Sequence, residues 1–190
     1  MPNQEIKSVP AVLVLEDGMV FHGRSFGKIG TTSGELCFNT GMTGYQEVFT
    51  DPSYFGQVLI MNTVHTGNYG VKPEDVESET VKIKGLIGRN LEERYSRLMA
   101  TDSLHNYLEQ QGVVSIEDID TRALVTHIRE KGAMNCIISS ENTNVEELKS
   151  ALPDSKIILV NGEMFSWYGS RLQYFNTNFL DDSISLRNIL

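Results

Sequence analysis

The first sixty residues alternate between short apolar runs and turns that contain Gly, Asp or Asn, a pattern typical of a small β-rich unit. Ala11–Leu15 is continuously apolar, as expected of a strand buried on both faces. Asp17-Gly18 follows, and an Asp-Gly pair between apolar runs predicts a tight hairpin with Met19–His22 as its returning strand. Two more strands are predicted at Glu35–Asn39 and Gln57–Thr63.

From residue 81 onward, strand-like and helix-like runs alternate. Thr121–Lys131 carries an apolar stripe at helical spacing, with cations in its last turn and Gly132 just beyond its end, so it is predicted to be a helix. Apolar residues at 104, 107 and 108 predict a shorter helix that ends at Gly112. Strands are predicted at Val81–Ile87, Val113–Ile116 and Met134–Ser139. Together these elements predict a mixed α/β domain with parallel and antiparallel pairs.

Two short segments have the sequence of a helix capping box. In Thr43-Gly44-Tyr45-Gln46, the Thr43 hydroxyl is expected to accept from the Gln46 backbone N–H while the Gln46 side chain reaches back. The helix that follows is expected to stop at Asp51, because Pro52 restricts the residue before it. Thr143-Asn144-Val145-Glu146 predicts a second such helix, ending before Pro153.

The residues after Pro153 differ in character. Lys156–Val160 is a possible strand, whereas Phe165–Phe179 is rich in aromatic residues without a helical or strand period. We interpret this stretch as a terminal appendage that packs loosely, or alternatively as an aromatic patch that meets a partner.

Composition narrows the class of protein. The 190-residue chain has a formal net charge of −9 and no basic stripe, which argues against a nucleic-acid or membrane-surface partner. Its first ten residues contain no apolar signal-peptide core, so the expected location is the cytoplasm. Cys37 and Cys136 each lie within a predicted strand and have no metal-ligand spacing, so both are expected to be buried, reduced thiols.

Few residues of this sequence are candidates for a self-contained catalytic site. Ser53 could act as a nucleophile with His65 as base and Asp51 or Asp75 as orienter, but Ser53 lies in a turn without a Gly-x-Ser-x-Gly elbow. The simpler interpretation is that Ser53 bonds locally within its turn. This Gly- and Asn-rich segment could also hold a polar zwitterion through exposed backbone amides and hydroxyls, and the alternative is that Asn39, Thr40, Thr43 and Ser53 only satisfy loop backbone groups. No metal site is expected, because none of the histidines has a second ligand at a metal-binding spacing. His105 and His127 are expected to face solvent on their helices.

Several blocks resemble, in order, the amino-terminal domain of the small, glutamine-using subunit of carbamoyl-phosphate synthase. The blocks are LVLEDG at Leu13–Gly18, FHGRSFG at Phe21–Gly27, GELCFNTGMTGYQEVFTDPSY at Gly34–Tyr54, HTGNYGVKPEDVES at His65–Ser78, GLIGR at Gly85–Arg89 and DIDTRALVTHIREKGAMN at Asp118–Asn135. Because several long motifs occur in one order, the resemblance covers most of residues 11 to about 150 and is far more specific than one short match.

The resemblance implies a three-layer β/β/α domain of the swivelling type over residues 1–152, with residues 153–190 as an unmatched tail. It also implies docking on the large synthetase subunit as a heterodimer, in arginine and pyrimidine biosynthesis. The serine of TDPSY, here Ser53, is implied to contact glutamine from across a domain boundary. ATP and magnesium would be used by the large subunit, so no cofactor is expected in this chain.

The match also has departures. The family's glutaminase half, with its cysteine nucleophile and later His and Glu, is not found in this sequence, so no catalytic residue is assigned and the chain alone is expected to be inactive. Val64 stands where the family usually has Pro, and Arg97 and Met99 replace its usual Asn and Arg. The alternative interpretation is a catalytically inert interaction module that competes for the large subunit.

Overall fold

The structure, a computed structural model, describes residues 8–152 together with the backbone of residues 155–160, 163–168, 171–175 and 183–185. The elements of the first part are β1 (Pro10–Leu15), β2 (Val20–Gly27), β3 (Thr31–Asn39), α1 (Tyr45–Thr50), η1 (Pro52–Tyr54), β4 (Val58–Met61), β5 (Gly85–Gly88), α2 (Leu104–Gln110), β6 (Val114–Glu117), α3 (Thr121–Lys131), β7 (Asn135–Ser139) and α4 (Val145–Ser150). The second part contains β8 (Ser155–Val160), β9 (Glu163–Tyr168), β10 (Arg171–Phe175) and β11 (Ser183–Ser185).

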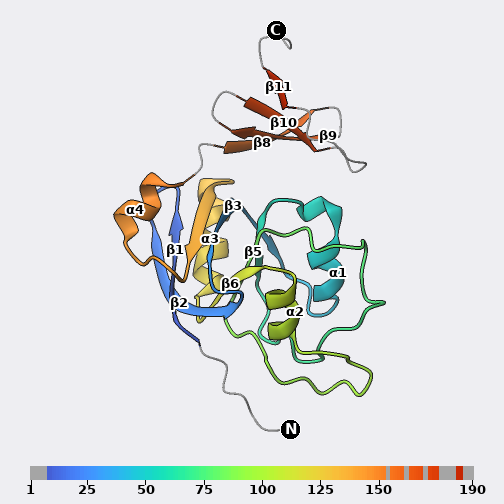
Figure 1. The fold of residues 1–190 in the computed structure, drawn as a ribbon. Helices are drawn as coiled ribbons and strands as arrows, with labels where there is room; N and C mark the ends of the chain where they lie inside the picture. The colour runs from blue at the N-terminus through green and yellow to red at the C-terminus, as the bar shows by residue number, and fades with distance from the viewer. Residues whose placement is uncertain (1–7, 153–154, 161–162, 169–170, 176–182, 186–190) are drawn as a thin grey trace.

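The first seven strands close into a barrel in the order β1-β2-β6-β5-β4-β3-β7 (Figure 1). Strands β3, β4, β5 and β6 run parallel to one another, and one row of partners crosses them at Leu36, Val58, Gly85 and Val114. The remaining pairs are antiparallel. The predicted mixed α/β fold is confirmed, and the carboxyl ends of the parallel strands meet at one end of the barrel.

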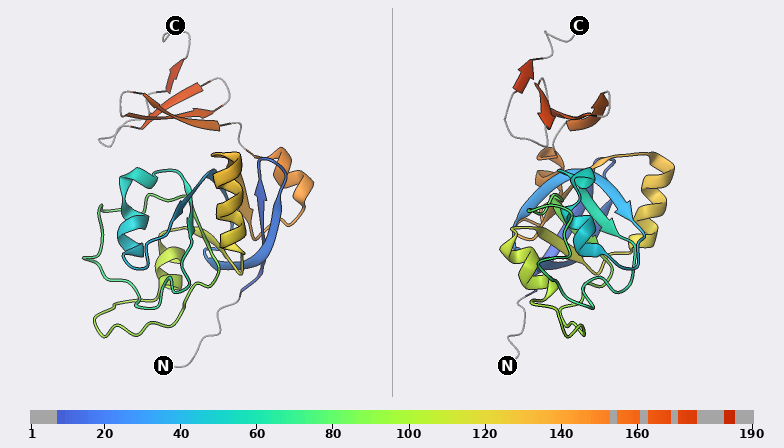
Figure 2. Two further views of the ribbon diagram at one scale, coloured as in Figure 1. Left: turned by 180° about the vertical axis from the view of Figure 1, so that it is seen from behind. Right: turned by 90° about the vertical axis from the view of Figure 1, so that its right-hand side faces the viewer.

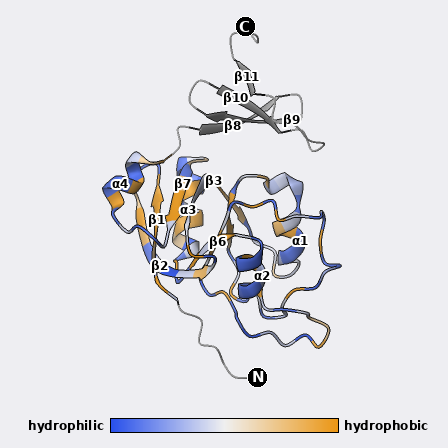
Figure 3. Cartoon of the chain, viewed as in Figure 1, coloured by the Kyte–Doolittle hydropathy of each residue, from blue (hydrophilic) through white to orange (hydrophobic). Residues whose placement is uncertain are grey.

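Alternate residues of the strands enter different cores, which explains their unbroken apolar runs. In β4, Val58 and Ile60 belong to a core shared with α3, whereas Leu59 and Met61 belong to a core shared with α1 and α2. Figure 2 shows α3 and α2 on opposite sides of the barrel, and Figure 3 shows the apolar strands between them. A strand covered on both faces has no polar side, so its sequence cannot alternate.

Most predicted elements are present, with shifted ends. The hairpin turns at Gly18, where φ is +93° and the Met19 N–H donates to Asp17 at 3.1 Å. The strand predicted at Val81–Ile87 pairs only over Gly85–Gly88, because the backbone before it bonds instead to Phe49 and Gln57. The predicted strand at Lys156–Val160 is confirmed as β8. Two strands also lie in the stretch that has no clear period, and the proposed aromatic patch there concerns side chains outside the described residues.

Both predicted capping boxes are wrong in detail. Helix α1 is preceded by Gly44 at φ 79°, with no side-chain cap, and the Gln46 amide points elsewhere: it donates to the Lys72 carbonyl and accepts from the Lys72 N–H, both at 2.8 Å. Helix α4 is capped by Asn144, whose side chain accepts from Glu146. The expected stop of α1 before Pro52 is confirmed, since the helix ends at Thr50.

His105 does not face solvent as expected, because it is buried between α2 and β2. Its Nδ1 accepts from the Gly27 N–H at 3.1 Å, and its ring meets Phe26 edge to face at 4.9 Å. Burial lowers the pKa of His105 below its ordinary value, against the opposing effect of Glu109 and Glu93. His127 is half-buried, with Nε2 lying 2.6 Å from Oδ2 of Asp17 in the hairpin turn.

The His105 contact predicts a pH-dependent stability. In the unfolded chain the imidazole titrates near 6.5, and in the folded chain at a lower pH, so the folded state binds fewer protons between these values. We therefore expect the His105 contribution to be complete above pH 6.5 and to be lost progressively below it. Urea unfolding between pH 7.5 and 5.5 measures this, and His105→Gln, which keeps an acceptor but does not titrate, should have a smaller loss over the same range. Equal losses would contradict the assignment.

Candidate functional site

Ser53 lies in a short, firmly held turn between α1 and β4. Asp51 closes α1 and begins η1, and its carboxylate accepts from the Ser53 N–H at 2.8 Å. Pro52 occupies the first position of η1, where a missing N–H costs nothing. At the far side of the turn, the Tyr54 hydroxyl accepts from the Asn39 amide at 3.0 Å. These contacts fix the backbone of the turn.

The fixed turn presents the Ser53 side chain to solvent. The residue is exposed, and among the described residues its hydroxyl has no hydrogen-bond partner. The local bond predicted for Ser53 is made by its backbone N–H, which leaves the hydroxyl available as donor and acceptor. No sequence signal identifies Tyr54 and Asn39 as the anchor, since the pair is joined only by the fold.

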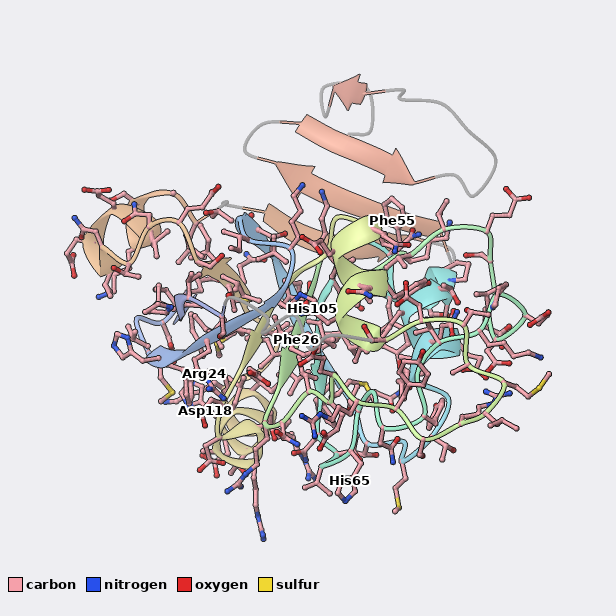
Figure 4. The ribbon with its side chains drawn as sticks, turned by 60° about the horizontal axis from the view of Figure 1, so that its bottom comes forward. Arg24, Phe26, Phe55, His65, His105 and Asp118 are labelled. Carbon is pink, nitrogen blue, oxygen red and sulfur yellow. The ribbon has the colours of Figure 1, made fainter. Side chains whose placement is uncertain are left out.

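The Ser53–His65 arrangement is not assembled. Ser53 precedes β4 and His65 follows it, so the two residues leave opposite ends of the same strand. Figure 4 shows Phe55, close to Ser53 in the chain, at the other end of the molecule from His65. Asp75 is held by Arg97, with 2.5 Å between Oδ2 and Nη1. A hydrolase triad needs hydrogen-bond reach between nucleophile and base, and this geometry does not provide it.

Much of the Gly- and Asn-rich segment satisfies its own backbone. Asn39 accepts from the Gly41 N–H at 2.6 Å, and the Tyr69 hydroxyl accepts from the N–H groups of Gly44 and Tyr45 at 2.7 and 3.3 Å. The rings of Tyr45 and Tyr69 stack at 4.3 Å, and burial raises the pKa of Tyr69. These polar groups hold loops together, whereas Thr40, Thr43 and Ser53 are exposed polar residues of the same segment.

The two cysteines are free and poorly suited to catalysis. Burial raises the pKa of Cys37 to about 12, and burial also raises the pKa of the fully enclosed Cys136. A nucleophilic cysteine needs a lowered pKa, so neither thiol is activated. Within the described part of the chain, no cluster of His, Cys, Asp and Glu could hold a metal ion.

A sequence profile of the family described as "Carbamoyl-phosphate synthase small chain, CPSase domain" matches residues 13–138. The chain belongs to this family. The matched stretch begins in β1 and ends in β7, so it contains the whole parallel section of the barrel and the Ser53 turn.

Carbamoyl phosphate synthase small chains from three organisms illustrate the similarity. That of Aquifex aeolicus is 51% identical over 138 residues, covering 73% of this chain and 37% of that one. That of Akkermansia muciniphila is 50% identical over 141 residues, covering 74% and 38%, and that of Cyanidium caldarium is 45% identical over 168 residues, covering 87% and 42%. This chain therefore spans less than half the length of these relatives. Among solved structures, an aminopeptidase from Aneurinibacillus sp. strain AM-1 overlays with a TM-score of 0.38 at 12% identity, covering 70% of this chain and 33% of that one, a likeness from which nothing follows.

The departures from the usual small-chain pattern can now be placed. Arg97 forms the ion pair with Asp75, so this substitution has a structural partner within the domain. Val64 and Met99 are 56% and 65% exposed, so neither is required by the core. Within the described residues, no helix has both the length and the apolarity needed to cross a bilayer.

Proposed function

We propose that this small-chain domain docks on the large chain of a carbamoyl-phosphate synthase and lends Ser53 to a glutamine site. The observation that carries the proposal is the exposed Ser53 hydroxyl, which has no hydrogen-bond partner among the described residues and lies on a turn fixed by Asp51 and Tyr54, inside the stretch that matches the family. A hydroxyl that donates and accepts, carried on a backbone that is already fixed, is suited to an amino-acid ligand because the turn need not be ordered on binding.

The proposal assigns the chemistry to other parts of the enzyme. Glutamine would be hydrolysed in a glutaminase domain, and the ammonia would pass to the large chain, where ATP and magnesium are used in the pathways to arginine and pyrimidines. The described residues alone would not hydrolyse glutamine, because Cys37 and Cys136 have raised pKa values and Ser53 has no base within reach. The three-layer swivelling arrangement expected from the family belongs to the same proposal, as does a cytoplasmic location.

The test is co-sedimentation of this chain with the large chain of the Aquifex aeolicus synthase, whose small chain is 51% identical over the matched region. We expect a complex at micromolar concentrations. The relative's own small chain should displace this chain from the complex, because both would bind the same surface of the large chain. The Ser53→Ala variant should sediment with the large chain equally well. Absence of a complex with this chain, while the Aquifex small chain binds, would contradict the proposal.

A second candidate is an inert interaction module, favoured by the unactivated thiols of the described residues. Such a module would occupy the large chain without supplying ammonia. Added to assembled Aquifex synthase, it should lower glutamine-dependent activity while leaving ammonia-dependent activity unchanged.

A further inference from the structure

A hollow of about 550 Å³ lies where the four parallel strands begin, at the opposite end of the barrel from His65. It is formed by the segments that lead into β3, β4, β5 and β6, with Phe55 and Gly56 contributing from the turn after Ser53. Gly56 has open space where a side chain would be. The volume is in the range of pockets that hold small molecules.

Three lysines line this hollow: Lys28, Lys82 and Lys84. None of them belongs to an ion pair among the described residues, where the paired Lys and Arg are Arg24, Lys72, Arg97 and Lys149. The ammonium of Lys82 donates to the Thr80 hydroxyl at 2.9 Å. Among the described residues of the lining, Glu141 is the only acid, and it accepts from the Thr31 hydroxyl at a long 3.5 Å.

The backbones that carry these lysines are fixed. The Lys28 N–H donates to Val113 at 3.1 Å, and the Lys84 N–H donates to Gln57 at 2.8 Å. The Thr32 hydroxyl donates to the Lys84 carbonyl at 3.0 Å. These bonds hold the backbone of the lining in place, and the lining side chains include three ammonium groups, the Gln111 amide and several apolar groups. Among the latter, Phe55 and Ile29 are 37% and 46% exposed.

The charge of the lining differs from that of the molecule. A chain of net charge −9 repels anions in general, yet the described residues that line this hollow include three cations and a single acid. Glutamine carries no net charge and a single carboxylate, so the ligand proposed for Ser53 does not account for three ammonium groups. Lysine binds phosphate and carboxylate as a point charge, and the two apolar side chains favour a ligand with an apolar part.

We propose that this hollow binds a small organic polyanion, a phosphate ester or polycarboxylate with an apolar part, at a site separate from the one that Ser53 serves. The site needs neither the large chain nor glutamine, so it can be tested on this chain alone. Its failure would leave the docking proposal untouched, and the reverse also holds.

The experiment is an NMR titration of the isotope-labelled full chain with phenyl phosphate, inorganic phosphate and citrate. We expect saturable shifts of the backbone amides of Ile29, Gly30, Gly56 and Gly112, with phenyl phosphate binding more tightly than inorganic phosphate. Saturation by phenyl phosphate but not citrate would identify a phosphate ester as the ligand, the converse would identify a polycarboxylate, and saturation by both would support the shared polyanion chemistry.

Matched variants distinguish binding of an anion in this hollow from general electrostatic attraction of anions to surface lysines. Lys28→Gln and Lys84→Gln should each weaken binding about three- to fivefold, as expected of a partly solvated ion pair. Lys131→Gln removes the same charge from the exposed end of α3 and should have little effect. Phe55→Ala should abolish the preference for phenyl phosphate over inorganic phosphate. Equal weakening by all three lysine variants, or no saturation by any probe, would overturn the proposal.

Discussion

Replacing Gly67 by alanine should lower the free energy of unfolding by about 3 kcal/mol. Gly67 has a φ of +101°, which side chains disfavour, and a Cβ built there would lie 2.4 Å from the Glu92 carbonyl oxygen. That oxygen belongs to the loop which the Glu92 N–H ties to Thr66 at 2.8 Å, so the backbone cannot retreat without breaking this bond. The cost of the positive φ and the cost of the steric overlap with Glu92 therefore add in the free energy of unfolding.

Gly56 provides the matched control for this prediction. Its φ of +76° is also positive, but nothing lies within 4 Å of the position that a Cβ would take. Gly56→Ala should therefore cost only the conformational strain, about 1 kcal/mol. Urea unfolding of both variants, followed by circular dichroism, gives the comparison. Equal losses would mean that the close approach to Glu92 is not part of the folded state.

Replacing Gln46 by alanine should cost about 2–3 kcal/mol, the second large effect. The side chain is buried at 2% exposure, and its amide satisfies both the N–H and the carbonyl of Lys72. Alanine would leave two polar groups of the loop without partners inside the protein. Gln46→Glu should cost at least as much as Gln46→Ala, because a carboxylate accepts from the Lys72 N–H but cannot donate to its carbonyl, and its charge would be buried.

Thr43→Ala is the complementary control, because a capping box would require its hydroxyl. The structure has no side-chain cap on α1, so this variant should unfold within about 0.5 kcal/mol of the unaltered protein. If Thr43→Ala lowered the free energy of unfolding more than Gln46→Ala does, the result would support the predicted capping box and contradict the observed contacts.

Local signals in the sequence predicted elements well where one interaction within a few residues decides the structure. The Asp17-Gly18 turn and the end of α1 before Pro52 depend on backbone conformations that these residue types prefer, and both are present. Thr43 and Gln46 also match a local rule, but the Gln46 side chain reaches Lys72, 26 residues later. A long-range partner competes with a local cap, and sequence spacing cannot reveal which of the two is made.

Long-range contacts also explain which features around the candidate site the sequence did not predict. His105 bonds to Gly27 from 78 positions away, and the lysines of the hollow come from segments that only the barrel brings together. Ser53, by contrast, could be singled out because Asp51 and Pro52 are its neighbours and the surrounding motif resembles a family. Its contribution to glutamine binding stays a prediction.

The most direct test of the account is the Michaelis constant for glutamine of a chimaeric enzyme. Residues 8–152 of this chain would replace the matching stretch of the Aquifex aeolicus small chain, and the chimaera would be assembled with its large chain. Ser53→Ala should raise KM for glutamine about fivefold, the loss of one hydrogen bond, with ammonia-dependent activity unchanged. Ser150→Ala, on α4, should change neither. An unaltered KM in the Ser53→Ala enzyme would contradict the claim that this turn helps to hold glutamine.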